Sequence, residues 1–294
     1  MSSVDGILLL HKPEGVTSFE VLQSVKTRFH TQKVGHTGTL DRFARGLLVV
    51  VVGSYTRLVD LLQDFEKEYL GTLEFGKETD TLDPEGRVVA DGPIPTLEEI
   101  NAQIPSFLGT ISQTPPSYSA VHVGGERAYR MARRGVTVEP PPRLVEIRSI
   151  QIENFKPPYL TLRVVCSKGT YIRSLARDLG RKCGSVAYLK ELTRLRIGTF
   201  QLKDAVLPSE LEKESRILTG VEVLSRLFPS RVLPASPSSG ILEGKPLHPS
   251  LFKGVHFQEG PYILVSPEKG DLLACMQYKA GKLSYRFVVS QKHL

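Results

Sequence analysis

A glycine-rich segment between residues 35 and 46 contains the best candidate for a chemical role, Asp41. Its three glycines allow tight turns and a close approach of a ligand to the backbone. The apolar, valine-rich run Leu47–Val52 follows and is typical of a strand buried on both faces. A loop carboxylate beside a rigid strand suits a nucleophile or a base, although Asp41 could also cap a turn and pair with Arg45.

A second candidate is the basic segment Gly124–Gly135, whose one acid is Glu126. On a helix, spacings of three and four would bring its guanidinium groups onto one side; they belong to Arg127, Arg130, Arg133 and Arg134. Such a helix could be a solvated surface or a phosphate-binding one. The net charge of +7, from 38 Lys and Arg against 31 Asp and Glu, is compatible with a polyanionic partner.

Strands and helices that could position these residues occur in irregular order, which indicates an α+β fold. Alternating residues predict strands at 69–75 and 160–166, and a phase slip at 145–152 predicts a bulge. Capping boxes predict helices after Thr17 and Thr96, the second interrupted by Pro105. Further elements are predicted as a strand at 7–11 and a helix at 170–182.

The texture of the chain changes after about Leu227, where prolines, serines and a glycine cluster between 229 and 240. Beyond this stretch we expect short strands at 262–265, 272–276 and 283–289. We therefore predict a large domain at 1–228, with the basic insert at about 121–143, and a small β domain at 229–294.

Several classes of protein are disfavoured. Cys166, Cys183 and Cys275 are scattered and form no C-x-x-C pair, so the sequence indicates neither a disulfide framework nor a zinc site. It has no dinucleotide fingerprint and no Walker loop. The apolar runs are too short to cross a bilayer, and the N-terminus lacks the features of a signal peptide. We expect a soluble cytoplasmic protein.

Five motifs, in order along the chain, resemble those of bacterial TruB-type tRNA pseudouridine synthases. The central one is G-H-T-G-T-L-D, which ends at Asp41, and it departs from the family in having Arg42 where proline is usual. The others are K-P-E-G-V-T-S from Lys12, the strand of Tyr69 with T-D-T-L-D-P-E-G from Thr79 onward, P-P-S-Y-S-A from Pro115, and K-G-T-Y-I-R from Lys168.

The resemblance implies a pseudouridine synthase fold, with a central mixed, mainly antiparallel sheet flanked by helices and a PUA-like, RNA-binding C-terminal domain. It implies a stand-alone enzyme that isomerises uridine 55 in the T-loop of tRNA and needs no cofactor and no metal. Asp41 would be the catalytic carboxylate, and Arg173 would keep it ionised. Tyr69 would be catalytic as well: it would stack on the flipped uracil, and its hydroxyl could take a proton from the sugar. The remaining substrate contacts would be His36, Tyr171, Leu192, Lys12, Asp80 and the four arginines of the insert, which would clamp the T-arm.

Taken alone, these residues have ordinary structural explanations as well. Arg173 could lie on the surface of an amphipathic helix, the tyrosines could be half-buried, and Leu192 could be a core leucine. Other functions also stay open: a guide-RNA-dependent pseudouridine synthase, a non-catalytic RNA-binding or tRNA chaperone protein, and an Asp-dependent hydrolase. The last is disfavoured because no motif places a second acid beside Asp41. Nothing in the sequence suggests an obligate dimer, so we expect a monomer.

Overall fold

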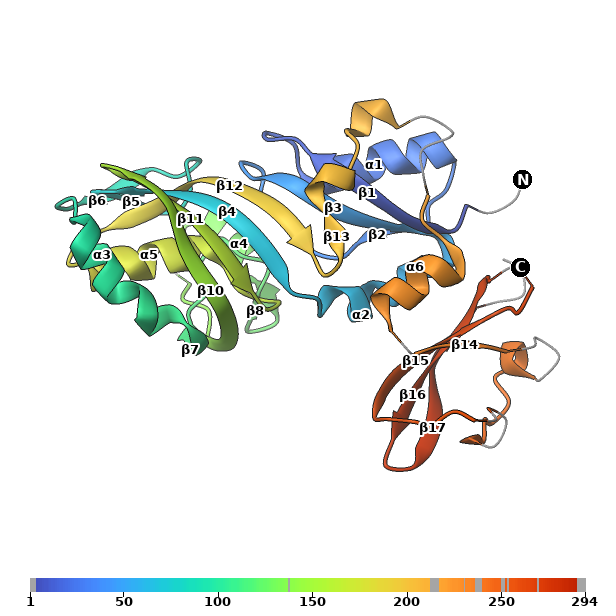
Figure 1. Ribbon diagram of the computed structural model, residues 1–294. Coiled ribbons are helices and arrows are strands. Elements are labelled where there is room, and N and C mark those ends of the chain that lie inside the picture. Colours follow the sequence, from blue (N-terminus) through green and yellow to red (C-terminus); the bar gives the residue numbers. More distant parts are fainter. Residues whose placement is uncertain are drawn as a thin grey trace.

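The computed structural model describes residues 4–136, 138–211, 217–229, 231–235, 240–249, 252, 254–268 and 270–289 (Figure 1). A nine-stranded sheet forms most of the molecule, in the order β1-β3-β12-β4-β11-β10-β7, with β13 on β12 and β2 on β3. Within the described residues, the neighbouring strands of this sheet pair antiparallel, except that β3 and β12 are parallel. The predicted α+β fold with a mixed, mainly antiparallel sheet is therefore confirmed.

The elements of this part of the chain have the following bounds. The strands of the large sheet are β1 (Gly6–Lys12), β2 (Val34–His36), β3 (Arg45–Val52), β4 (Lys67–Phe75), β7 (Gly109–Gln113), β10 (Arg143–Lys156), β11 (Tyr159–Cys166), β12 (Ala187–Ile197) and β13 (Phe200–Gln201). Two hairpins lie outside it, β5 (Lys77–Thr79) with β6 (Val88–Asp91) and β8 (His122–Val123) with β9 (Glu126–Arg127). The helices are α1 (Ser18–Phe29), α2 (Val59–Gln63), α3 (Leu97–Gln103), α4 (Ala128–Arg133), α5 (Ile172–Lys182) and α6 (Gly220–Leu227).

Both faces of β3 are buried, as its continuous apolar sequence predicts. Leu47, Val49 and Val51 belong to one hydrophobic cluster, and the alternate residues of the strand belong to another, which α1 covers. Thr17 caps α1 and forms the predicted capping box with Glu20. β3 follows the glycine-rich loop directly. The residues packed on both faces of β3 therefore fix the end of the loop that joins this strand.

The other half of the sheet packs against α5, which contacts β12 and β4 (Figure 1). The predicted capping box at Thr96 and the break at Pro105 are confirmed, the second as a 3-10 turn from Ile104 to Phe107. The slip in β10 is confirmed as two register shifts, between Ile147 and Ser149 and between Ile152 and Asn154.

Two expectations need correction. β12, between β3 and β4, was not predicted, because register shifts at Leu189/Glu191 and Arg194/Arg196 interrupt its alternation and a buried arginine lies inside it. The basic insert is also less helical than its spacing suggested. Its helix α4 spans six residues, so Arg127 precedes it in β9 and Arg134 follows it.

The last strands form a separate four-stranded sheet in the order β14-β15-β16-β17, below α6 in Figure 1. They are β14 (Val232–Pro234), β15 (Gly260–Val265), β16 (Leu272–Lys279) and β17 (Lys282–Val288), which confirms the predicted C-terminal β region. Ile263 and Cys275 share a hydrophobic cluster with Leu224 of α6 and Tyr55 and Leu58, which follow β3. The boundary at 228/229 stays a prediction, because this core extends across it. Within the described residues, no helix is long and apolar enough to span a membrane.

Candidate active site

Asp41 lies in the loop between β2 and β3, and its side chain is 38% exposed. Leu40, the residue before Asp41, binds the loop to the start of α1. Leu40 N–H donates to Ser18 Oγ at 3.0 Å, and Ser18 Oγ donates to Leu40 O at 3.2 Å. The structure therefore presents an accessible carboxylate on a fixed backbone.

The guanidinium of Arg173, on α5, meets Asp41 along one edge. Arg173 Nη2 donates to Asp41 Oδ1 at 3.2 Å, and Nε lies 2.9 Å from Oδ2. The Nε–H is not aligned well enough to count as a hydrogen bond, so that second contact is electrostatic. The arginine side chain is only 5% exposed. A buried, fixed cation therefore lies directly beside the Asp41 carboxylate.

A second carboxylate, Asp83, contacts the same guanidinium and was missed in the sequence as a site residue. Arg173 Nη1 donates to Asp83 Oδ2 at 3.0 Å, and Asp83 is 6% exposed. Asp83 Oδ1 accepts from Thr81 Oγ1 at 2.6 Å and from Glu85 N–H at 3.0 Å. Burial raises the pKa of Asp83, while Thr81 and Arg173 oppose that rise. Its signal was present, because Asp83 lies within the T-D-T-L-D-P-E-G motif.

Backbone carbonyls complete the setting of Arg173: Nη1 also donates to Thr81 O at 2.9 Å, and Nη2 donates to Tyr118 O at 3.0 Å. Between Thr81 and Asp83, Leu82 adopts a left-handed φ of 61°, which is costly for a residue with a Cβ. Leu82 is held there by its N–H bond to Thr79 O and by accepting from Leu189 N–H. The guanidinium is therefore fixed by two acids and by two loops.

Tyr69 and Leu192 lie on neighbouring strands, β4 and β12, and belong to one hydrophobic group that also includes Leu40. Leu192 is buried, and Tyr69 is half-buried. Burial raises the pKa of the Tyr69 hydroxyl, whereas the charge of Arg194 lowers it. The structure thus gathers the predicted apolar wall and the predicted stacking tyrosine next to the residue that precedes Asp41.

Tyr171 is half-buried and precedes the first residue of α5. Gln113, on edge strand β7, holds its backbone in both directions: Tyr171 N–H donates to Gln113 Oε1 at 2.8 Å, and Gln113 Nε2 donates to Tyr171 O at 3.1 Å. The Arg143 guanidinium lies 5.4 Å from the centre of the tyrosine ring. The aromatic face is thus held by residues of the sheet edge.

His36 ends β2 and faces the same loop. Its Nδ1 accepts the Gly38 N–H at 3.2 Å, and burial and then the charge of Arg194 lower the pKa of the imidazole. A neutral ring that accepts from the loop backbone therefore helps to shape the loop. No group of three or more His, Cys, Asp or Glu side chains that could hold a metal occurs in the described part of the chain.

Lys12 and Asp80 lie in different settings. Lys12 is fully buried, and its Nζ donates to the carbonyls of Pro13 at 2.9 Å, Val16 at 2.5 Å and Arg42 at 3.3 Å. Burial lowers the pKa of Lys12 to about 8, although Asp41 opposes this. It therefore fastens the Asp41 loop to the chain after β1 and exposes no surface for a ligand. Asp80 is exposed, and its Oδ1 accepts from Arg87 N–H at 2.9 Å.

The four arginines of the insert are exposed. Arg134 pairs with Glu126 at 2.6 Å, whereas Arg130 and Arg133 lie over the ring of Tyr129. No contact of these arginines with Asp41 occurs among the described residues. The insert is anchored nearby, because Tyr129 N–H donates to Ser119 O, one residue after the Tyr118 carbonyl that Arg173 holds.

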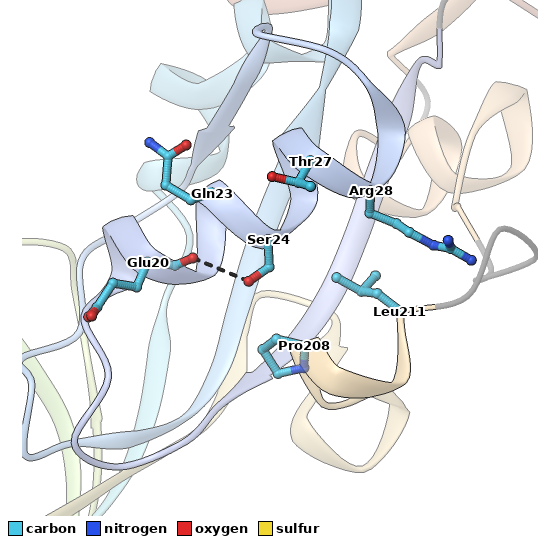
Figure 2. Close-up of a pocket in the computed structure, with 7 residues that line it drawn as sticks. All are labelled: Glu20, Gln23, Ser24, Thr27, Arg28, Pro208 and Leu211. Atoms are coloured by element: carbon cyan, nitrogen blue, oxygen red, sulfur yellow. Dashed lines mark hydrogen bonds between the residues drawn. The ribbon is translucent and has the colours of Figure 1, made fainter.

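A groove on the outer side of α1 is a different feature (Figure 2). Its lining contains none of the residues predicted to bind or react with a substrate: it consists of Glu20, Gln23, Ser24, Thr27, Arg28, Pro208 and Leu211. The reactive groups gather instead where the loop before β3, the loop between β5 and β6 and the start of α5 meet.

Comparisons with known proteins show which family the sequence resembles. Residues 26–172 match the model of the N-terminal domain of the TruB family of pseudouridylate synthases. The chain is 46% identical over 216 residues to tRNA pseudouridine synthase B of Borreliella burgdorferi (strain ZS7), which covers 72% of this chain and 77% of that protein. Its counterpart in Borrelia garinii subsp. bavariensis is 38% identical over 288 residues, covering 97% of this chain and 99% of that protein.

Among solved structures, a chain of a Cbf5-Nop10-Gar1 complex superimposes with a TM-score of 0.70 at 24% identity. The match covers 97% of this chain and 84% of that one. At this identity the likeness concerns the fold, and it extends through the C-terminal sheet.

Proposed function

The chain belongs to the TruB family of pseudouridylate synthases, and on that premise we propose that it isomerises uridine 55 in the T-loop of tRNA, with Asp41 as the catalytic carboxylate. The relatives' names, tRNA pseudouridine synthase B, support tRNA as the substrate. The reaction breaks the N1–C1′ bond, turns the uracil and forms a C5–C1′ bond. C5 loses its proton and N1 gains one, so the product is an isomer and the reaction needs no redox cofactor and no donor.

The observation that carries this proposal is the pairing of an accessible Asp41 with a buried, fully fixed Arg173. Arg173 occupies one edge of the carboxylate, which leaves the remaining lone pairs open to a ligand. An ionised carboxylate in that position can attack C1′ or remove a proton from the sugar. Both routes use the same group, and both need it to be ionised.

A stacked uridine cannot reach Asp41, so the target base must leave the T-loop stack. Tyr69 and Leu192, which lie in one hydrophobic group with Leu40, would receive the uracil, and Tyr171 would provide a second aromatic face. Stacking on an aromatic side chain is worth roughly 1–3 kcal/mol per base, which offsets part of the cost of flipping. His36 and the loop around it would support the flipped RNA.

The exposed arginines of the insert would contact the phosphates of the T-arm, and the C-terminal sheet would add RNA-binding surface. We propose that the enzyme acts as a cytoplasmic monomer without a guide RNA. Charge contacts of this kind fix the position of the RNA, while the shape of the T-loop and its splayed bases supply the choice of substrate.

The decisive experiment is to incubate the protein alone with unmodified tRNA transcript and then map pseudouridine by carbodiimide modification and primer extension. We expect one modified site in the T-loop, both in whole tRNA and in an isolated T-arm stem-loop. Modification only after a guide RNA and partner proteins are added would favour the guide-dependent alternative. Tight binding without pseudouridine would favour an RNA-binding or chaperone protein.

A further inference from the structure

A buried arginine in the middle of the sheet, which lowers the pKa of Tyr69 and His36, has so far been given no part in the reaction. Arg194 of β12 is 1% exposed and is one of the largest fully buried side chains of the protein. Among the described residues it forms no ion pair, whereas Arg196 on the same strand pairs with Glu66 at 2.7 Å and with Glu68 at 2.9 Å. Burying an unpaired guanidinium carries a large desolvation cost, so the fold must gain something specific from it.

The guanidinium of Arg194 connects the two ends of the loop that carries Asp41. Nη2 donates to Gly38 O at 3.0 Å, three residues before Asp41. Nε donates to Leu47 O at 2.7 Å, in β3 just after the loop. One planar, rigid group therefore fixes the separation of the two ends, and both bonds are shielded from water because the side chain is buried.

The same residue also reaches the strand that carries Tyr69. β12 lies between β3 and β4, and Arg194 is the register partner of Gly46 on one side and of Tyr69 on the other. The backbones of Gly46 and Arg194 are so close that a Cβ on Gly46 would lie 2.4 Å from Arg194 O. Arg194 also lies close enough to Tyr69 for its charge to lower the pKa of the tyrosine hydroxyl.

We propose that Arg194 is a positioning residue for pseudouridine formation, which holds the Asp41 loop in a fixed place relative to the Tyr69 hydroxyl. The inference rests on the proposed function, because it assigns Arg194 to the reaction of that site. The guanidinium donates to acceptors on the loop and on β3, while the backbone of Arg194 pairs with Tyr69 of β4. Only a forked guanidinium can donate to separate acceptors in fixed directions. A lysine keeps the charge but offers one point of attachment.

The test uses purified full-length variants and single-turnover kinetics on T-arm RNA, after the wild-type protein has been shown to make pseudouridine. Rates are measured per RNA-binding-competent enzyme, so that misfolded protein does not lower them. Displacing a reacting group by about 1 Å can cost on the order of a hundredfold in rate. We therefore expect Arg194→Met to lower kcat by about that factor while KM changes by less than about threefold, and Arg194→Lys to recover only part of the loss.

A double-mutant cycle with Tyr69→Phe separates positioning from general support of the fold. If Arg194 acts through Tyr69 and the loop together, the combined loss of Arg194→Met and Tyr69→Phe should be much smaller than the product of the single losses. Arg196→Met is the matched control, because it removes an arginine from the same strand that pairs away from the site, and it should leave kcat unchanged.

The proposal is overturned by a wild-type kcat in Arg194→Met, by full recovery of kcat in Arg194→Lys, or by losses that multiply in the cycle. If Arg194→Met does not fold, the cycle with Arg194→Lys gives the same decision. Absence of pseudouridine with the wild-type protein would instead overturn the proposed function, so the two failures are distinguishable.

Discussion

At the scale of single residues, the site depends on one guanidinium shared by two carboxylates in different settings. Asp41 is 38% exposed and Asp83 is 6% exposed, yet both contact Arg173. The buried acid can balance the arginine when the exposed one is engaged with a substrate. This arrangement separates structural support, given by Asp83, from the chemical role that we propose for Asp41.

Asp41→Asn tests that separation. The variant keeps the shape of the side chain and loses its charge, and Arg173 keeps Asp83 and two carbonyls as partners. We expect turnover to be abolished, while affinity for tRNA stays within about tenfold, or ~1.4 kcal/mol. The measurements are pseudouridine yield and filter binding, with Asp178→Asn, a surface acid paired with Arg177, as the control. Near wild-type turnover would remove Asp41 from the mechanism.

Lys12 gives a prediction about pH. Its folded pKa is lowered to about 8 from the ordinary value of 10.5, so between those values the unfolded chain binds more protons than the folded one. Unfolding free energy therefore rises with pH across that window, and Lys12→Met should lack this contribution. Urea unfolding at pH 7.5 and about pH 10 measures it. Lys168→Met, which retains Lys12, should keep the wild-type slope. Burial also lowers the pKa of Lys67 to about 8, so Lys12→Met should keep the part of the slope that Lys67 contributes, and a slope as steep as that of the wild type would contradict the assignment.

At the scale of elements, the loop before β3 lacks the family's usual proline and has Arg42 in its place. The structure shows a clasp there: Arg42 Nε donates to Gly15 O at 2.9 Å, and Gly15 N–H donates to Arg42 O at 2.9 Å. Lys12 Nζ reaches the same Arg42 carbonyl. A side-chain hydrogen bond therefore restrains a segment that a fixed φ restrains in other members of the family.

Substitutions of Arg42 test whether its side-chain hydrogen bond restrains the loop in place of the fixed φ of a proline. Arg42→Ala loses the side-chain bond and should be less stable by about 0.5–1.5 kcal/mol. Arg42→Pro loses the same bond but stiffens the unfolded chain, so it should recover about 0.4–1 kcal/mol relative to Arg42→Ala. Urea unfolding of the three proteins gives the order. A proline variant less stable than the alanine variant would show that the backbone at this position is incompatible with proline.

Local signals predicted several elements, because each depends on neighbours in sequence. Short sequence patterns predict the capping box at Thr17, the apolar strand that ends at Val52 and the register shift in β10. β12 escaped prediction because its two bulges and the buried Arg194 depend on strands far away in sequence. Asp41 and Arg173 could be predicted from motifs. The role proposed for Arg194 could not, because it depends on the register of β3, β12 and β4.

At the scale of the whole molecule, the C-terminal sheet packs through α6 onto the strand that follows the Asp41 loop. Composition predicted a β region after residue 229, but this shared core depends on side chains such as Tyr55 and Ile263, which lie far apart in the chain. No local pattern records such a contact. The consequence is a continuous scaffold from the C-terminal sheet through β3 to the catalytic loop.

Charge in the basic insert also acts at the scale of the whole molecule, because it would hold the RNA at a distance from the reacting sugar. The structure divides its arginines: Arg134 is paired with Glu126, while Arg130 and Arg133 lie on Tyr129 and form no ion pair among the described residues. Arg130 and Arg133 therefore have charges that are available for phosphates. Each lost phosphate contact should flatten the slope of log K against log salt by roughly 0.7–0.9.

Arg130→Ala combined with Arg133→Ala should raise KM several-fold and leave kcat near that of the wild type, because contacts far from the sugar bind the ground state and the transition state alike. Arg148→Ala is the matched control, since Arg148 is an exposed arginine of β10 that pairs with Glu66. KM and kcat measured at two salt concentrations decide the matter. An unchanged salt slope would refute phosphate contact, and a collapsed kcat would mean that the insert, anchored beside Tyr118, shapes the active site through the carbonyl that Arg173 holds.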